Sequence, residues 1–336
     1  MVVDERKKVG VVLFQLGGPD SPEAVEPFLY NLFCDPDIIP LGPLGGILRK
    51  PLARYIARRR SRVAAHHYNE IGGQSPIRLL TERQARALES ALRPHVEPRV
   101  VVAMRYWHPL TAEAVQQIDG TALNDLVLLP LYPQYSFATS RSSLNEWARV
   151  YRQPRPQMSL HTIENFYSHP LYIQAIAERI ALSLAHFDRP NNAHLVFSAH
   201  GLPMSLVERG DPYPRQVEAT VRLVLECGGW PNAHTLCFQS KVGRQKWLEP
   251  SLTETIERLA HAGAKHVLVV PIAFVTEHIE TLHEINIEAR EQAERLGVEQ
   301  FEMMPALGDS PRFIATLADL VLRAVGMEVP LVASTK

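Results

Sequence analysis

Short apolar runs alternate with amphipathic stretches along most of the chain. The apolar runs are continuous, which is typical of parallel strands that are buried on both faces. The stretches between them repeat apolar residues at helical spacing, as in Thr81–Leu92, Pro214–Cys227 and Leu252–Ala262. This alternation predicts an α/β fold in which ligands bind at the carboxyl ends of the strands. The predicted strands are Val9–Leu16, Val100–Met104, Leu126–Leu131, Leu195–Phe197, Thr235–Phe238 and Val267–Ile272.

Two pairs of segments indicate an internal duplication. Val12–Pro19 reads Val-Leu-Phe-Gln-Leu-Gly-Gly-Pro and is similar to Val196–Pro203, which reads Val-Phe-Ser-Ala-His-Gly-Leu-Pro. The residues around Pro130 are likewise similar to those around Pro271. Chance similarity between two apolar strands is the alternative. A duplication predicts two similar α/β halves in one chain.

The predicted halves are residues 1–165 and 166–336, and we allow for the last helix to pack back on the first half. The first half carries extra residues at about 34–78, where apolar side chains mix with Arg49, Lys50, Arg54 and Arg58. Such a mixture is typical of an amphipathic lip that dips into an anionic membrane surface. A surface hairpin of two helices with solvated arginines would produce the same pattern.

Composition narrows the class of protein. The 336 residues are 46% hydrophobic and carry a formal net charge of −1, which argues against a nucleic-acid-binding protein. Cys34, Cys227 and Cys237 form no metal-binding spacing and suit a reducing compartment. There is no signal peptide pattern, and no apolar run approaches the roughly 18 residues that span a bilayer. We expect a cytoplasmic protein, with peripheral contact with the inner face of the cell membrane if residues about 38–60 form a lip.

His200 is the first candidate for chemistry. It closes a predicted buried strand and precedes Gly201, at the sheet edge where α/β proteins bind their ligands. A neutral imidazole with an ordinary pKa of about 6.5 can accept a proton or bind a metal ion. A histidine that is only hydrogen-bonded within a turn is the alternative.

A row of glutamates is the second candidate. Thr276 is predicted to cap a helix that starts just after the strand Val267–Ile272. On such a helix, five glutamates fall within roughly 80° of one another. The row is either a solvated surface face or a ladder of carboxylates that conducts cations or protons. Its members are Glu277, Glu280, Glu284, Glu288 and Glu291.

Further polar loops follow other predicted strands. Arg105–His108, Tyr132–Ser143 and the segment from Gln239 to Trp247 supply cations, hydroxyls and aromatic rings. Cations and hydroxyls suit carboxylate groups, and aromatic rings suit a flat ligand. Any α/β protein has polar loops at these places, so it is their convergence that indicates a binding site.

At these residues the chain resembles the ferrochelatase family across nearly its whole length. The resemblance implies two Rossmann-like domains with a porphyrin cleft between them, and a lyase of haem biosynthesis that inserts Fe²⁺ into a porphyrin. The substrates of such an enzyme are the porphyrin and Fe²⁺. We also expect transient contact with the preceding enzyme of the pathway. The matching stretches, in the family's order and spacing, are Leu16–Asp20, Tyr68–Ile77, Met104–Tyr106, Tyr132–Ser136, Phe197–Pro203, Gly210–Tyr213, Gln239–Gly243 and His278–Leu282.

The resemblance also implies roles for individual residues. His200 and Glu280 are the catalytic pair and the metal site, facing each other across a slot for the macrocycle, and Glu284 and Glu288 continue as the ladder. Metallation needs acceptors for two pyrrole protons and labile ligands for iron, and imidazole and carboxylate supply both. Bending of the ring by walls such as Trp247 would expose a nitrogen lone pair. The residues expected to contact the porphyrin are Leu16, Ser75, Arg59, Arg60, Arg105, Tyr106, Tyr135, Ser136, Lys241, Trp247, Phe274 and His278.

Two departures from relatives refine the expectation. Phe137 stands where some relatives carry a cysteine for a [2Fe–2S] cluster, and no cysteine follows Cys237, so we expect no cluster and no permanently bound cofactor. The branch that uses coproporphyrin III usually has a tyrosine at the position of Leu16, so we expect protoporphyrin IX as the substrate. A coproporphyrin III ferrochelatase, a cobalt or nickel chelatase for another tetrapyrrole, and a haem or porphyrin carrier that does not turn over are the alternatives.

Overall fold

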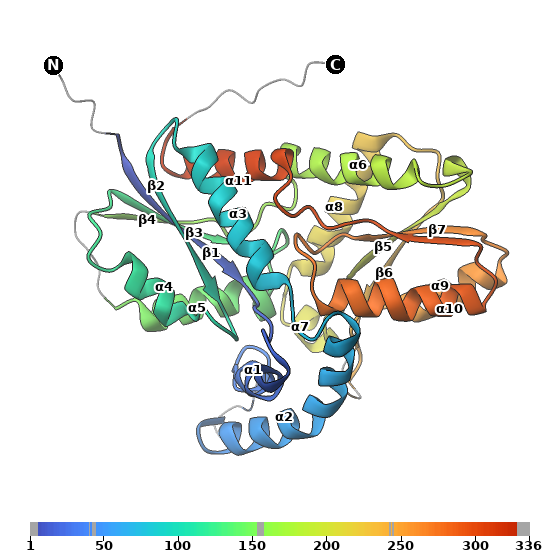
Figure 1. The fold of residues 1–336 in the computed structure, drawn as a ribbon, viewed down its shortest axis with the longest axis horizontal. Coiled ribbons are helices and arrows are strands. Elements are labelled where there is room, and N and C mark those ends of the chain that lie inside the picture. The colour runs from blue at the N-terminus through green and yellow to red at the C-terminus, as the bar shows by residue number, and fades with distance from the viewer. Residues whose placement is uncertain are drawn as a thin grey trace.

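The computed structural model describes residues 6–39, 41, 45–152, 158–241, 243 and 245–327. Residues 40 and 42–44 of the predicted insertion, and Val242 of the stretch Gln239–Gly243, lie outside this part. The chain forms two four-stranded parallel sheets flanked by helices, which confirms the predicted α/β class (Figure 1).

The two sheets have the same strand order, β2-β1-β3-β4 and β6-β5-β7-β8. Pro130 pairs with Phe14 in the first sheet, and Pro271 pairs with Ser198 in the second. Phe14 and Ser198 occupy the same place in the two similar segments, so the sheets match in register as well as in order. The strands are β1 (Lys8–Gln15), β2 (Glu97–Met104), β3 (Asp125–Pro130), β4 (Ser159–Thr162), β5 (His194–His200), β6 (His234–Gln239), β7 (His266–Pro271) and β8 (Gln300–Met303).

The central strands are buried on both faces, as their continuous apolar sequences predict. Val11 and Leu13 of β1 point into a core that both sheets share, and Val12 and Phe14 point the other way, against Trp147. Successive side chains of a strand alternate between its faces, so each central strand needs apolar residues at every position.

Helices cover both faces of each sheet. In the first sheet, α4 and α5 lie on the outer face, and α3 lies against the shared core together with α6, α8 and α11. In the second sheet, α9, α10 and η5 pack on the outer face. The last helix, α11, contacts both α3 and α6 and so joins the two halves. The bounds are α3 (Ile77–Leu92), α4 (Thr111–Ile118), η3 (Phe137–Arg141), α5 (Ser142–Val150), α6 (Pro170–Leu184), η4 (Pro190–Asn192), α7 (Met204–Glu208), α8 (Tyr213–Gly228), α9 (Leu252–His261), η5 (Glu280–Ala289), α10 (Arg290–Arg295) and α11 (Pro311–Ala324).

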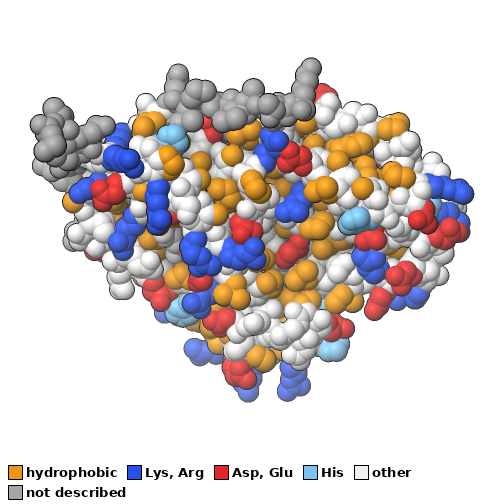
Figure 2. Space-filling view, turned by 45° about the horizontal axis from the view of Figure 1, so that its top comes forward, with side chains coloured by type: hydrophobic (Ala, Val, Ile, Leu, Met, Phe, Trp, Pro, Cys, Tyr) orange, Lys and Arg blue, Asp and Glu red, His pale blue; other side chains and the backbone are white. Residues whose placement is uncertain are grey.

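Most of the described part of the insertion predicted at about 34–78 is helical, and a further helix lies just before it. After η1 (Pro22–Ala24), helices α1 (Val25–Phe33) and α2 (Gly45–Glu70) pack on each other at one end of the molecule (Figure 1). Lysine and arginine side chains project from that end (Figure 2). No helix in the described part of the chain is both long enough and apolar enough to cross a membrane.

Candidate active site

His200 is the last residue of β5, and its ring is oriented by the backbone. Its Nδ1 lies 2.5 Å from the carbonyl oxygen of Gly201 and donates a hydrogen bond to it. The other ring nitrogen, Nε2, therefore faces outward and lies 3.7 Å from Oε1 of Glu280. When the ring is neutral, this orientation presents the Nε2 lone pair toward Glu280; when the ring is protonated, its Nε2–H points there instead.

Gly201 allows the backbone to come close beneath this histidine. A Cβ atom at this position would lie 2.8 Å from the carbonyl oxygen of Gln239 and 3.2 Å from a ring carbon of Trp247. The backbone amide of Gly201 also donates a hydrogen bond to the carbonyl of Gln239. Trp247 is buried, and its backbone pairs with Pro203 in an isolated bridge. Trp247 therefore lies directly beside the segment that carries His200.

Glu280 lies between two imidazole rings. Its Oε2 is 3.7 Å from Nε2 of His278, whose Nδ1 bonds to the carbonyl oxygen of Thr276 at 3.1 Å. Burial alone would raise the pKa of Glu280, but the positive charge of His200 and His278 outweighs burial and lowers this pKa to about 2. Burial opposes protonation of His278, but the Glu280 carboxylate outweighs it and raises the pKa of that imidazole. Glu280 is therefore an anion at neutral pH, and its buried Oε2 accepts no hydrogen bond from the described residues.

The open slot expected between His200 and Glu280 is absent from the described structure. A flat ring held between two groups needs van der Waals contact on both of its faces, or about 7 Å in all. The 3.7 Å that separates Nε2 of His200 from Oε1 of Glu280 is too short for this. His200 is 40% exposed and Glu280 only 16%, so His200 is the side chain with room to turn aside.

The helix that carries Glu280 starts later than predicted. Thr276 does not cap it: Thr276 is buried, and its hydroxyl accepts a hydrogen bond from the side-chain amide of Gln15 in the first half of the chain. The segment from Glu280 to Ala289 is a π-helix, an uncommon form that is frequent at functional sites. Glu277 lies before it and accepts a hydrogen bond from the backbone amide of Ala306, so Glu277 does not belong to the row.

Glu284 is the next carboxylate along the π-helix. Ser240 donates a hydrogen bond to its Oε2 at 2.5 Å, and the side-chain amide of Gln239 donates another at 3.2 Å. The same Gln239 amide bonds the backbone carbonyl of Glu280. Burial, and secondly the charge of Glu280, raise the pKa of Glu284 to about 7. Two neighbouring carboxylates with pKa values this far apart share one proton across the pH range between the two values, and Glu284 gives this proton up as the pH passes through about 7.

The outer glutamates lie in other surroundings. Glu288 is 55% exposed and faces His283, while Glu291 is exposed and pairs with Arg295. The row therefore runs from the buried Glu280 to the solvent at Glu288. The alternative interpretation of the row as a solvated surface face is therefore wrong for Glu280 and Glu284.

In the first half, four of the predicted porphyrin contacts lie near one another. Ser75 donates its amide proton to Pro19, and Tyr106 donates its amide proton to Leu16. Arg105 pairs with the buried Asp35 at 2.9 Å, and the hydroxyl of Tyr106 bonds the same carboxylate. Tyr106 is fully buried, so in this structure it holds Asp35 in place and lines no accessible surface.

The remaining predicted contacts divide between buried and exposed positions. Ser136 is buried and donates a hydrogen bond to Asp211 at 2.9 Å, which ties the loop after β3 to the second half. Tyr135 in the same loop is partly exposed. The Phe274 ring lies 4.7 Å from the ring of His278. The exposed cations are Lys241, Arg59 and Arg60.

Two tyrosines beside Glu280 were not predicted as site residues. The pKa of Tyr68 and that of Tyr213 are raised by burial and also by the charge of Glu280. Tyr68 lies on α2 and Tyr213 begins α8, so both halves of the chain contribute to this carboxylate's environment. Both lie in stretches that carry the family resemblance, and this was the only sequence signal for them.

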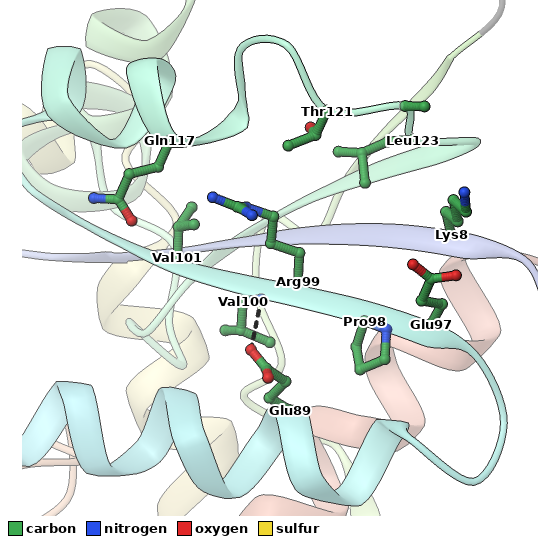
Figure 3. A pocket seen from close by; sticks show the side chains of 11 residues that line it. Lys8, Glu89, Glu97, Pro98, Arg99, Val100, Val101, Gln117, Thr121 and Leu123 are labelled. Atoms are coloured by element: carbon green, nitrogen blue, oxygen red, sulfur yellow. Dashed lines mark hydrogen bonds between the residues drawn. The ribbon is translucent and has the colours of Figure 1, made fainter.

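A hollow elsewhere on the molecule does not belong to this site. It lies between α3 and α4, beside the first residues of β1 and β2 (Figure 3). Glu89 and Glu97 line it together with Lys8 and Arg99, so its charges are mixed. It is at the amino ends of the strands, away from the carboxyl ends that carry His200 and Arg105.

Comparison with known proteins identifies the family of the chain. A family model described as Ferrochelatase matches residues 8–325. A ferrochelatase of Geotalea daltonii is 48% identical over 320 residues, which cover 95% of this chain and 99% of that relative. A ferrochelatase of Thermosynechococcus vestitus is 48% identical over 322 residues, covering 95% of this chain and 82% of the relative.

Solved structures agree on the fold. SirB from Bacillus subtilis with Fe³⁺ matches with a TM-score of 0.54 and 13% identity, covering 95% of this chain and 94% of that one. The sirohydrochlorin chelatase SirB in complex with cobalt, from Bacillus subtilis subspecies spizizenii, matches with a TM-score of 0.52 and 11% identity, covering 95% and 96%. At these identities the likeness concerns the fold alone. The family match and the close relatives show more: the chain belongs to the ferrochelatase family, the lyases that insert iron into a porphyrin.

Proposed function

We propose that this ferrochelatase inserts Fe²⁺ into protoporphyrin IX and that His200 and Glu280 form the site of insertion. The observation that carries the assignment is the buried Glu280 carboxylate between two Nε2 atoms, each 3.7 Å away. These distances are longer than hydrogen bonds, and Oε2 lacks a hydrogen-bond partner among the described residues. Such a group of nitrogen and oxygen donors suits a divalent iron ion in transit.

The reaction releases two protons for each iron that enters. The Gly201 carbonyl holds the His200 proton on Nδ1, so that Nε2 of the neutral ring is free to accept a pyrrole proton or to touch the metal. His200 turns away from Glu280 when the porphyrin enters, and Glu280 keeps its place. Both residues remain candidates for proton acceptor and for iron delivery.

Glu284 and Glu288 carry protons from Glu280 to the solvent in this proposal. A carboxylate with a pKa near 7 accepts and releases protons readily at neutral pH, and the pKa of Glu284 is raised to about 7. Glu288, 55% exposed, lies one step further along the helix and reaches water.

The porphyrin lies among the predicted contacts of both halves. The exposed cations Arg59, Arg60 and Lys241 attract its carboxylates, whereas Arg105 is already paired with Asp35 and acts by holding the neighbouring loop. Leu16 follows β1 at the place that His200 takes in the second sheet, and the coproporphyrin III branch usually has a tyrosine at this position, so Leu16 supports protoporphyrin IX as the substrate. The enzyme works without a permanently bound cofactor or [2Fe–2S] cluster.

The lip contacts a membrane surface. Ile47 is 80% exposed, Leu48 48% and Tyr55 59%, and arginines surround them on α2. Exposed apolar side chains beside cations favour the interface of an anionic membrane. We place the enzyme in the cytoplasm, at the inner face of the cell membrane, where transient contact with the preceding enzyme of haem synthesis would deliver the porphyrin.

Anaerobic incubation with Fe²⁺ and either porphyrin tests this function. The absorbance change of metallation should continue over many turnovers, with a higher kcat/KM for protoporphyrin IX than for coproporphyrin III. The reverse preference would transfer the assignment to coproporphyrin III. Uptake of one equivalent without turnover would identify a carrier, and turnover of only another tetrapyrrole would identify a different chelatase.

A further inference from the structure

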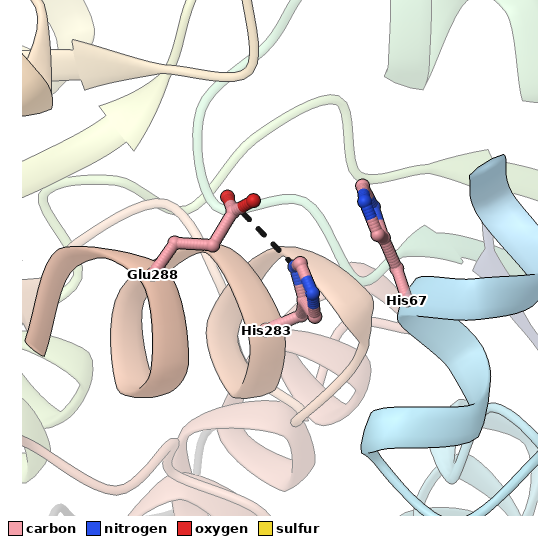
Figure 4. A group of neighbouring side chains, drawn as sticks. All are labelled: His67, His283 and Glu288. Atoms are coloured by element: carbon pink, nitrogen blue, oxygen red, sulfur yellow. Dashed lines mark ion pairs between the residues drawn. The ribbon is translucent and has the colours of Figure 1, made fainter. Parts of the chain in front are cut away.

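The π-helix η5 makes a contact that an α-helix would not allow. His283 and Glu288 are five positions apart, yet Nδ1 of His283 lies 3.8 Å from Oε2 of Glu288 (Figure 4). On an α-helix, side chains five positions apart point about 140° away from each other. In a π-helix, where backbone hydrogen bonds join residues five apart, such side chains lie on the same side. The place of Glu288 therefore depends on the π form.

The whole row of glutamates depends on this form. Glu280, Glu284 and Glu288 follow one another at intervals of four positions. Four residues are slightly more than one turn of an α-helix and slightly less than one turn of a π-helix. The row therefore turns around the helix axis in opposite directions in the two forms. A change to the α form would turn Glu284 and Glu288 away from the side chains that they now contact.

The ends of η5 are fastened to the two edge strands of the second sheet, β6 and β8. At the end of β6, the side-chain amide of Gln239 donates a hydrogen bond to the backbone carbonyl of Glu280 at 2.8 Å. At the other end, the guanidinium of Arg290 donates a hydrogen bond to the backbone carbonyl of Phe301 in β8 and lies 5.1 Å from the centre of its ring. Since π-helices are rarely longer than a single turn, the ten residues of η5 need such contacts.

Arg290 also determines the backbone pattern where η5 ends. Its own N–H donates to the carbonyl oxygens of Ile285, five residues back, and Ile287. In an α-helix this N–H would bond to the carbonyl of Asn286, four residues back. Here that carbonyl accepts a hydrogen bond from Nε of the Arg290 side chain at 3.2 Å. The side chain of Arg290 thus takes the place of the α-helical hydrogen bond that its backbone does not make.

The arrangement uses the planar guanidinium rather than its charge alone. A second nitrogen of Arg290 donates a hydrogen bond to the side-chain oxygen of Asn286 at 2.9 Å, while the first carbonyl and that of Phe301 are bound by the other two. Glu302 lies 3.8 Å away and balances the charge. A lysine would keep the attraction to Glu302, but its compact ammonium group does not present donors in this fixed fork.

We infer that Arg290 is a positioning residue for iron insertion, which holds η5 in the π form and thereby sets the places of Glu284 and Glu288. The inference rests on the proposed proton transfer along that row. Arg290 acts through the glutamates, since its guanidinium is directed at Asn286 and β8.

Single-turnover metallation of protoporphyrin IX by the full chain tests this role. Arg290→Met keeps an extended side chain but loses its hydrogen bonds. It should lower the rate about tenfold to hundredfold, because small displacements of reacting groups have effects of this size. Porphyrin affinity, measured by fluorescence, should stay close to that of the wild type. Arg290→Lys should behave like Arg290→Met. Arg295→Met, which removes an exposed arginine of the same helix α10 that pairs with Glu291, is the matched control and should react like the wild type.

A second background separates positioning from a general loss of structure. Glu284→Gln interrupts the row, so adding Arg290→Met to it should lower the remaining rate by less than about threefold. A merely structural role would lower the rate by the same factor in both backgrounds. Asn286→Ala removes only one of the hydrogen bonds to Arg290. It should show the same coupling with a smaller fall in rate, and it serves as the test if Arg290→Met does not fold.

Three results would overturn the inference. They are a wild-type rate in Arg290→Met or, if that variant does not fold, in Asn286→Ala; equal falls in rate in the two backgrounds; and a wild-type rate in Arg290→Lys. An unchanged rate in Glu284→Gln alone would instead refute proton transfer along the row, and the role of Arg290 with it.

Discussion

The hydroxyl of Ser240 lies 2.5 Å from a carboxylate oxygen of Glu284, and Ser240 has a φ of 64°. It is the only non-glycine residue with positive φ in the described part of the chain. This conformation costs of order 1 kcal/mol or more and persists where surrounding contacts enforce it. Here the neighbouring Gln239 binds both Glu280 and Glu284. The turn after β6 is thus fixed to the helix that carries the inner carboxylates.

Replacement of Glu284 by glutamine should change how stability depends on pH. Its pKa, raised from 4.5 to about 7, means that the folded protein binds a proton there which the unfolded chain releases. The stability that Glu284 contributes is complete below about pH 4.5 and is lost as pH rises through about 7. When the pH is raised from 5 to 7.5, the free energy of unfolding of Glu284→Gln should therefore fall less than that of the wild type. The difference should be a few kcal/mol at most, since one pKa unit corresponds to about 1.4 kcal/mol.

Urea unfolding at a series of pH values measures this effect. Glu291→Gln, which removes an exposed carboxylate on the following helix α10, should show the same dependence of stability on pH as the wild type. If the stability of Glu284→Gln depended on pH in the same way as that of the wild type, folding would not add a proton to Glu284. The proposed role of Glu284 in proton transfer would then lose its basis.

Gly201→Ala should damage both folding and activity. The new methyl group would lie 2.8 Å from the Gln239 carbonyl and 3.2 Å from Trp247, so backbone and ring must shift. Overpacking of this kind costs typically about 1–3 kcal/mol and would displace His200. Urea unfolding and kcat provide the measurements. Gly46→Ala, where the methyl group meets nothing within 4 Å, should be neutral or slightly stabilising. Wild-type activity in Gly201→Ala would show that His200 does not depend on this close approach.

Arg105→Met should destabilise the protein by about 3–5 kcal/mol, because it leaves Asp35 as an uncompensated buried charge. Adding Asp35→Asn removes that charge and should restore part of the loss in urea unfolding. An exposed pair serves as the control: Arg222→Met breaks the contact with Glu226 and should change stability by less than about 1 kcal/mol. A double variant no more stable than Arg105→Met would show that the unpaired charge is not the cause.

The double variant Ile47→Ser, Leu48→Ser should bind anionic vesicles at least about tenfold more weakly than the wild type, since each buried apolar side chain contributes about 1.5–3 kcal/mol. Vesicle sedimentation measures this. Leu182→Ser on α6, which removes an apolar side chain that is 61% exposed, should bind like the wild type. Equal binding of all three proteins to the vesicles would show that the lip does not contact the membrane and is only a surface hairpin of helices.

Local sequence patterns predicted six of the eight strands in the described part of the chain, because short continuous apolar runs between helical stretches are typical of buried parallel strands, and these patterns placed His200 at a strand end. They missed β4 and β8, which are short edge strands with polar residues. They failed where a distant contact decides the structure. Thr276 has the side chain of a helix cap, but the side-chain amide of Gln15 uses its hydroxyl. The sequence predicts that Tyr106 lines the porphyrin pocket, but Tyr106 is buried and its hydroxyl donates a hydrogen bond to Asp35, 71 positions away. Contacts with distant residues such as Gln15 and Asp35 produce no periodic pattern in the sequence, so they could not be predicted from it.

The role of His200 is tested most directly by single-turnover metallation of protoporphyrin IX under anaerobic conditions, with porphyrin binding measured in parallel by fluorescence. Loss of a group that accepts protons or touches the metal lowers rates by about 10²–10⁴-fold. We predict a fall of that size in both His200→Ala and Glu280→Gln, with porphyrin affinity close to that of the wild type. Iron insertion at the wild-type rate in either variant would contradict the assignment of these two residues as the site of the reaction.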